Sequence, residues 1–154
     1  MKKIILFFGI AIALTTVTSC KKEKEGCTDS MANNYSSDAS KDNGTCKFDR
    51  DAIIGNYLTN GTENCGGTSY SYSDIQMSIT ASSVAKNKVL LSFEGTIFTC
   101  TISGTSITIE NKSEGGFNYS GSGQVNGTVL TLNMTVYDVA ADETCILNLT
   151  GIKQ

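Results

Sequence analysis

The amino-acid sequence predicts an all-β domain, a small antiparallel up-and-down barrel of eight strands, with a β-sandwich as the alternative. From about residue 53 onward, apolar and polar residues alternate with a period of two, in runs rich in Thr, Ile, Val and Tyr. Gly and Asn interrupt these runs at short intervals, and no apolar stripe of helical period competes with them. The barrel domain is therefore expected at residues 53–154.

The alternating runs predict strands that are joined by very short turns. Asn126-Gly127 is a strong signal for a two-residue hairpin, and segments 103–105 and 114–116 are turn-like. Sequential hairpins place each strand beside the next one along the chain, as in an up-and-down sheet. In order, the expected strands are 54–62, 71–81, 88–94, 96–103, 106–110, 117–125, 129–138 and 144–152.

Each expected strand has one apolar and one polar face. In the seventh strand, for example, Leu130 and Leu132 have one parity, whereas Thr131 and Asn133 have the other. Such strands must curve over their apolar side, and a barrel of eight strands can hold one small ligand inside. The alternative is that the inward side chains fill the barrel and leave no cavity. If a cavity exists, its expected lining is Tyr57, Met77, Ile79, Leu91, Phe93, Phe98, Phe117, Tyr119, Leu132 and Met134.

Two cysteines support closure of the sheet. Cys65 follows the first expected strand, and Cys145 lies near the start of the last one. In a closed antiparallel barrel these two strands are neighbours that run in opposite directions, so the two cysteines meet. We therefore predict a Cys65–Cys145 disulfide. Cys100 lies on the apolar face of its strand and is expected to be a buried, reduced thiol without redox chemistry.

Residues 1–19 are predicted to be a signal peptide. Two lysines at positions 2–3 precede an apolar run at 4–14, which is shorter than the about 20 residues that a membrane-spanning helix needs. The V-T-S-C sequence that ends at Cys20 resembles the lipobox of bacterial lipoproteins. This resemblance implies cleavage before Cys20 and attachment of lipid there, including fatty acids such as palmitate.

The residues after Cys20 indicate where the lipidated protein would reside. Segment 20–26 comprises the lipidated cysteine and a charged tether. Lys21 is not the Asp that the best-known sorting rule associates with retention in the inner membrane. We therefore expect a lipid-anchored protein of the outer membrane, on its periplasmic or cell-surface face.

Residues 27–48 are expected to form a separate module stapled by a disulfide. The segment between Cys27 and Cys46 is rich in Asn, Asp, Ser and Gly and offers almost nothing to bury, so a Cys27–Cys46 bridge, stabilising by about 3 kcal/mol, would hold it. Its pattern of C-T-D, A-x-N-Y, A and D-x-G-x-C resembles a short cysteine-bracketed module of exported bacterial proteins.

The same segment contains spaced oxygen ligands that would suit calcium, which takes six to eight of them. These candidate ligands are Asp29, Asp38, Asp42 and Asn43. The D-x-D-x-D-G loop of an EF-hand is absent, however, and the segment has no Glu. The alternative is a stapled spacer that holds no cofactor.

The barrel domain resembles small lipocalin-like lipoproteins over residues 53–153. The resemblance rests on the Gly55-Asn56-Tyr57 start, on the number of strands and on the D-E-T-C-I-L-N-L sequence near residue 145. Tyr57 stands where true lipocalins have Trp. The resemblance implies a barrel that can carry a small hydrophobic ligand.

Composition argues against catalysis and against nucleic-acid binding. The 154 residues include no His, the commonest general acid or base, and no G-x-S-x-G, P-loop or dinucleotide motif. Residues 49–154 contain twice as many Asp and Glu as Lys and Arg, which is unsuited to phosphate backbones. We therefore expect a non-enzymatic lipoprotein whose barrel is a binding or interaction module for a surface protein or glycan. The alternative is a carrier of a small hydrophobic ligand.

Overall fold

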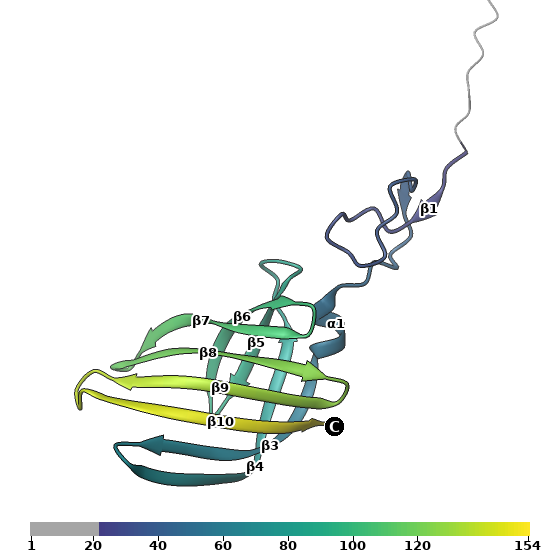
Figure 1. Cartoon of the computed structure of the whole chain (residues 1–154). Helices are drawn as coiled ribbons and strands as arrows, with labels where there is room; N and C mark the ends of the chain where they lie inside the picture. Colours follow the sequence, from purple (N-terminus) through teal and green to yellow (C-terminus); the bar gives the residue numbers. More distant parts are fainter. Residues whose placement is uncertain (1–21) are drawn as a thin grey trace, which may run out of the picture.

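The computed structural model describes residues 22–154, in which a small N-terminal module precedes a closed β-barrel (Figure 1). The predicted signal peptide and Cys20 lie outside the described residues. No helix in the described part of the chain has the length and the hydropathy of a membrane span.

Eight strands form the barrel, each antiparallel to its neighbours and in chain order, and the last strand pairs with the first. The predicted antiparallel up-and-down barrel is therefore confirmed, and the sandwich alternative is excluded. The strands are β3 (Gly55–Cys65), β4 (Thr68–Ala81), β5 (Lys88–Phe93), β6 (Thr96–Ser103), β7 (Ser106–Glu114), β8 (Phe117–Asn126), β9 (Val129–Asp138) and β10 (Glu143–Lys153).

The observed strands are longer than the predicted ones, mainly at one end of the barrel. β4 begins at Thr68 and β7 continues to Glu114, beyond the expected limits of 71 and 110. In both regions the pairing register shifts, opposite Asn60 of β3 and just after Ile109 of β7. A β-bulge of this kind breaks the alternation of period two on which the prediction depends.

The Cys65–Cys145 disulfide crosses the seam at which the barrel closes. The two residues lie directly opposite each other on β3 and β10, and their sulfur atoms are bonded. Cys100 is a free thiol with 0% exposure. Burial raises the pKa of this thiol to about 12, so it stays protonated at neutral pH. The predicted disulfide and the predicted burial of a reduced Cys100 are thus confirmed.

A short helix, α1 (Asp49–Ile53), covers the end of the barrel at which β3 begins and β10 ends (Figure 1). Ile53 belongs to the barrel core, and Arg50 is 92% buried beside it. The Arg50 guanidinium donates hydrogen bonds of 2.8 Å to the backbone carbonyls of both Ser82 and Ala85. The sequence predicts no element here, because five residues are too few to show a helical stripe. We call this end of the barrel the closed end.

Two glycines on the inner face of β8 allow it to approach β9 closely. A Cβ atom on Gly121 would lie 2.5 Å from the carbonyl oxygen of Asn133, and one on Gly123 would lie 2.3 Å from that of Thr131. Only residues without a side chain fit at such distances. These positions let the sheet bend sharply enough to close around its apolar core.

The core consists of buried side chains from α1 and the inner faces of the strands. They are Ile53, Tyr57, Met77, Ile79, Val89, Leu91, Phe93, Phe98, Cys100, Ile102, Ile107, Ile109, Val125, Leu130, Leu132, Met134, Leu147 and Leu149.

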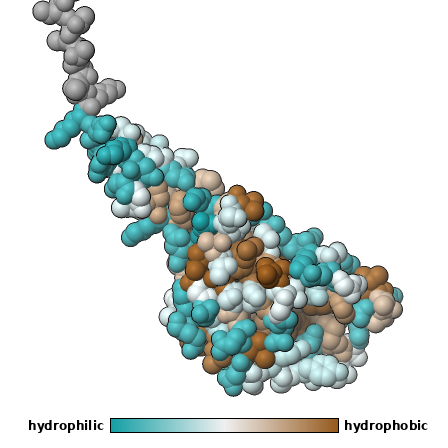
Figure 2. Space-filling model, turned by 180° about the vertical axis from the view of Figure 1, so that it is seen from behind, coloured by the Kyte–Doolittle hydropathy of each residue, from teal (hydrophilic) through white to brown (hydrophobic). Residues whose placement is uncertain are grey.

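The N-terminal module, residues 22–48, is held together differently. Two short parallel strands, β1 (Glu25–Gly26) and β2 (Lys41–Asp42), lie beside the predicted Cys27–Cys46 disulfide, which is confirmed. Within the described part of this module, the buried apolar residues are Cys27 and Ala32. Figure 2 shows the module as largely hydrophilic, whereas hydrophobic side chains appear over the barrel.

Candidate functional site

The end of the barrel away from α1 is open. Four hairpin turns surround it, those that join β3 to β4, β5 to β6, β7 to β8 and β9 to β10 (Figure 1). We call this end the mouth. A pocket of about 320 Å³ lies inside it and is lined by Glu63, Tyr72, Phe93, Glu94, Thr96, Phe98, Phe117, Tyr119, Met134, Val136 and Leu147.

Aromatic rings form one wall of this mouth pocket. The rings of Phe98 and Tyr119 lie 5.3 Å apart in an edge-to-face arrangement, and the ring of Phe117 lies 6.2 Å from that of Tyr119. Phe98 is almost completely buried, whereas Phe117 at the rim is 37% exposed. The wall thus offers ring surface to a ligand while the core holds its base in place.

Two carboxylates are the charged groups of the pocket lining. Glu63 accepts a hydrogen bond from the hydroxyl of Tyr72. This hydrogen bond, with burial, raises the pKa of Tyr72 to about 12, so its hydroxyl stays protonated at neutral pH. Glu94 lies in the β5–β6 turn, where its φ of 49° places it in the left-handed region. Among residues 22–154, neither Glu63 nor Glu94 forms a salt bridge.

The β5–β6 hairpin, which lines part of the pocket, is short compared with the neighbouring strands. β4 pairs with β5 only over its last part, from Met77 to Ala81. Similarly, β6 pairs with β7 only from Cys100 to Ser103. The wall of the barrel is therefore notched at this hairpin, between the longer strands β4 and β7, and residues Phe93, Glu94 and Thr96 of the hairpin line the pocket.

Lys112 of β7 reaches across to β6 near the mouth, where the two strands do not pair. Its ammonium donates to the carbonyl oxygen of Ile97 at 2.9 Å and lies 2.6 Å from the carboxylate of Glu114. It also lies 5.6 Å from the centre of the Phe98 ring. The cation nearest to the pocket is thus already engaged by an anion.

The structure divides the ten residues that the sequence predicts as lining. Five of them line the mouth pocket: Phe93, Phe98, Phe117, Tyr119 and Met134. The other five do not reach it and fill the closed half of the barrel with at most 1% exposure: Tyr57, Met77, Ile79, Leu91 and Leu132. The prediction of a lining is wrong for this second group, because large side chains pack there against one another and under α1.

The sequence does not predict the polar residues of the pocket. Glu63 lies beyond the expected end of the first strand at residue 62, in a segment whose Asn, Gly and Thr content suggests a turn. Tyr72 is missed because the bulge at Asp74 changes the parity of β4, so that Tyr72 and Ile75, three residues apart, both pack against the core. No local sequence signal identifies that bulge.

The four candidate calcium ligands have separate local contacts. Asp29, Asp42 and Asn43 each accept a hydrogen bond from the backbone N–H two residues further along the chain. Asp38 lies 2.8 Å from the ammonium of Lys24, which lowers the pKa of this carboxyl. Among residues 22–154, the three aspartates do not gather into a cluster of carboxylates. They serve turns and an ion pair of the module in this arrangement.

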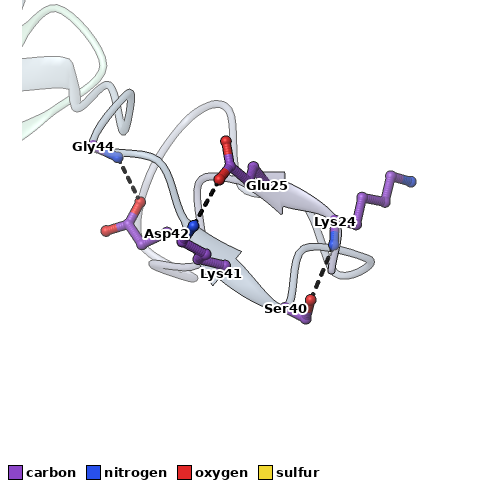
Figure 3. Close-up of polar contacts among 6 residues, drawn as sticks. All are labelled: Lys24, Glu25, Ser40, Lys41, Asp42 and Gly44. Carbon is purple, nitrogen blue, oxygen red and sulfur yellow. Dashed lines mark hydrogen bonds and ion pairs between the residues drawn. The ribbon is translucent and has the colours of Figure 1, made fainter. Parts of the chain in front are cut away.

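Residues that the sequence assigns to the tether take part in the fold of the module. The backbone N–H of Lys24 donates to the hydroxyl of Ser40, and the ammonium of Lys41 pairs with Glu25 at 2.8 Å (Figure 3). The same view shows Asp42 accepting from the backbone N–H of its turn. The folded module therefore includes residues 24–26, which the sequence assigns to the tether.

The module contacts the closed end of the barrel. The side-chain amide of Asn33 donates to Asp49 at the start of α1, at 2.8 Å. The other carboxylate oxygen of Asp49 accepts from the backbone N–H of Gly104, in the β6–β7 turn, at 2.7 Å. These two hydrogen bonds lower the pKa of Asp49. The module and the mouth therefore lie at opposite ends of the barrel.

Comparisons with known proteins assign no family and no role to the chain. No family model and no curated protein matches the chain. A crystal structure of a protein of unknown function from Bacteroides ovatus is similar to it, with 19% identity and a TM-score of 0.48, over 66% of this chain and 41% of that protein. The chain thus spans less than half the length of that protein.

Proposed function

We propose that this chain is a non-enzymatic binding protein, anchored at the outer membrane through lipid on Cys20, whose barrel binds a small ligand with an apolar body in the mouth pocket. The observation that carries the proposal is the pocket itself, about 320 Å³ with eight apolar or aromatic side chains in its lining. This volume lies within the usual range of about 300–1,000 Å³ for small-molecule sites.

The closed half of the barrel supports this role. Its side chains are fully packed, and α1 covers its end, so the strands that carry the pocket have a rigid base. A site on rigid strands holds its lining residues in place without the cost of ordering them when ligand binds. The resemblance to lipocalin-like lipoproteins is in keeping with a ligand inside the barrel.

The position of the module favours access from the aqueous side. A lipid on Cys20 would precede the module, which contacts the closed end through Asn33 and Asp49. The mouth would then point away from the bilayer. In this orientation the pocket exchanges ligand with the surrounding solution, or with a partner, rather than with the lipid directly below.

Exposed apolar side chains on the mouth hairpins support a second candidate function, recognition of a surface protein or glycan. Tyr70 in β4 and Val139 in the β9–β10 turn are each 54% exposed. Exposed Tyr among small polar residues is typical of recognition surfaces. This function would use the rim of the mouth and not its interior.

Native mass spectrometry tests the choice between these functions. The full chain carrying Cys20→Ser would be expressed in a periplasm, so that both disulfides form, and measured before and after organic extraction. We expect a discrete extra mass that the solvent removes. A bare polypeptide mass before extraction, together with no binding of added decanol, would contradict the carrier function and favour the rim. A calcium-dependent mass increase would instead support the predicted metal site in the module.

A further inference from the structure

Acidic residues are concentrated at the mouth. The turns and adjoining strand ends there carry six carboxylates: Glu63, Glu94, Glu114, Asp138, Asp142 and Glu143. The same segments carry one cation, Lys112, which pairs with Glu114. The other basic residues of 49–154 are Arg50 in α1, Lys86 and Lys88 at the β4–β5 connection, and Lys153 at the end of β10, all at the closed end.

This separation of charge gives the barrel a negative end that coincides with its pocket. Like charges around a concave site with apolar walls focus the field and raise the local concentration of counter-ions. A cation would therefore be drawn toward the mouth, and an anion would be repelled from it. This electrostatic field acts on a charged ligand before it contacts the pocket, whatever residues line the pocket.

The lining itself favours the same sign of charge. Glu63 and Glu94 line the pocket without forming a salt bridge within the described residues, and the aromatic wall of Phe98, Phe117 and Tyr119 lies in the same pocket. An organic ammonium group is attracted both by a carboxylate and by the faces of aromatic rings. The pocket is thus suited to a cationic group that is attached to an apolar body.

We infer that the mouth pocket selects ligands in which an organic ammonium group is attached to an apolar chain or ring. This inference rests on the proposed function and adds the class of ligand to it. The ammonium is bound by the carboxylates of Glu63 and Glu94, and the apolar body packs against Met134, Val136 and Leu147. Fatty acids and other anionic amphiphiles are disfavoured, because the nearest cation, Lys112, is held by Glu114 and by the carbonyl of Ile97.

The test compares three probes that share one alkyl chain and differ only in the charge of the head group. Decylamine, decanol and decanoate would each be titrated, below the concentration at which they form micelles, into the periplasmically expressed Cys20→Ser chain, with binding followed by NMR of backbone amides. At neutral pH and low salt, we expect decylamine to bind about tenfold more tightly than decanol, and decanoate to bind more weakly than decanol. Physiological salt should reduce this preference.

A charge-matched pair of variants assigns the preference to the pocket. Glu63→Gln together with Glu94→Gln should bring the affinity for decylamine close to that for decanol. Glu23→Gln together with Glu25→Gln removes the same charge from the module and should leave the tenfold preference unchanged. If the first pair does not fold, Glu94→Gln alone, at an exposed turn position, should reduce the preference by a measurable factor.

The possible failures separate the two proposals. Equal affinities for decylamine and decanol, with shifts of mouth amides for both, would overturn the inference and leave the proposed function intact. Loss of the preference in the Glu23 and Glu25 pair would overturn it as well, because the charge effect would then be nonspecific. Absence of binding by all three probes would contradict the inference and the small-ligand function together.

Discussion

The two halves of the barrel consist of the same eight strands but differ in how completely their interiors are filled. Toward the closed end, inward side chains such as Tyr57 and Leu91 have no exposed surface. Toward the mouth, Tyr119 is only partly buried, Phe117 is 37% exposed, and Glu63 shares the interior. Alternation along a strand therefore determines which side chains point inward, but not whether they meet one another or leave space for a ligand.

Two features account for the difference. At the closed end, α1 adds Ile53 to the core, and the buried Arg50 satisfies backbone carbonyls of the β4–β5 connection. At the mouth, the short β5–β6 hairpin leaves a notch in the wall, and a carboxylate among the inward residues is stable only where water can reach it. We therefore expect the half at the mouth to depend less on packing and more on the Cys65–Cys145 disulfide.

The largest expected effect concerns that link. Replacing the Cys65–Cys145 disulfide, which joins residues 80 apart in sequence, by Cys65→Ser and Cys145→Ser should lower the free energy of unfolding by about 4 kcal/mol in urea denaturation. Hydrogen exchange should accelerate most at the mouth end of β3 and β10. Cys27→Ser with Cys46→Ser is the control, because it should unfold the module and leave barrel stability almost unchanged. Equal losses from both pairs would mean that the stability of the barrel depends on the folded module.

The next effect compares packing in the two halves directly. Leu91→Ala removes a fully buried side chain near the middle of β5 and should lower the free energy of unfolding by about 3 kcal/mol. Phe117→Ala removes a larger side chain at the rim and should lower it by less than about 1 kcal/mol, because that ring is already partly hydrated. Denaturation curves of both variants decide this. A greater loss for Phe117→Ala would mean that the mouth is packed as a core.

A smaller effect is expected at the closed end itself. Arg50→Met keeps much of the buried aliphatic stem but leaves the carbonyls of Ser82 and Ala85 without their donor. The expected loss is about 2 kcal/mol in the same denaturation measurement. Lys86→Met, an exposed position nearby, is the control and should change stability by less than about 0.5 kcal/mol. If the two substitutions have the same effect, the buried guanidinium does not stabilise the closed end.

The smallest effect is a dependence on alkaline pH at the mouth. The folded pKa of Tyr72 is raised to about 12 from its ordinary value near 10, chiefly by its hydrogen bond to Glu63. The folded state therefore holds this proton more tightly than the unfolded state. The stabilising contribution is fully present below about pH 10 and is lost as the pH rises toward 12. Burial also raises the pKa of Tyr57, and a hydrogen bond to Asp142 raises that of Tyr137, so ultraviolet titration should show several late tyrosines. One of them should be missing in Tyr72→Phe, and a late phase of unchanged size in that variant would exclude the assignment.

The sequence alone predicts the architecture of the barrel well and the details of its two ends only partly. Strand order, the barrel and both disulfides follow from alternation, turn residues and cysteine positions, because these are local signals that sheet closure makes consistent. The pairing of Glu63 with Tyr72 does not follow, since it depends on a bulge at Asp74 that shifts parity by one residue. The sequence does not predict helix α1 for a similar reason, because its position depends on contacts of Arg50 with residues more than 30 positions away.

The placement of strand ends also affects how freely the binding site can vary. β3 enters the barrel and β10 leaves it at the closed end, next to α1, so each of the four mouth turns is a simple hairpin loop between two paired strands. Exposed hairpin tips tolerate insertions and substitutions far better than buried strands do. A change of length or composition in these loops would alter the site without altering the closure of the barrel. The same scaffold could therefore be redesigned for a different ligand by grafting loops at one end.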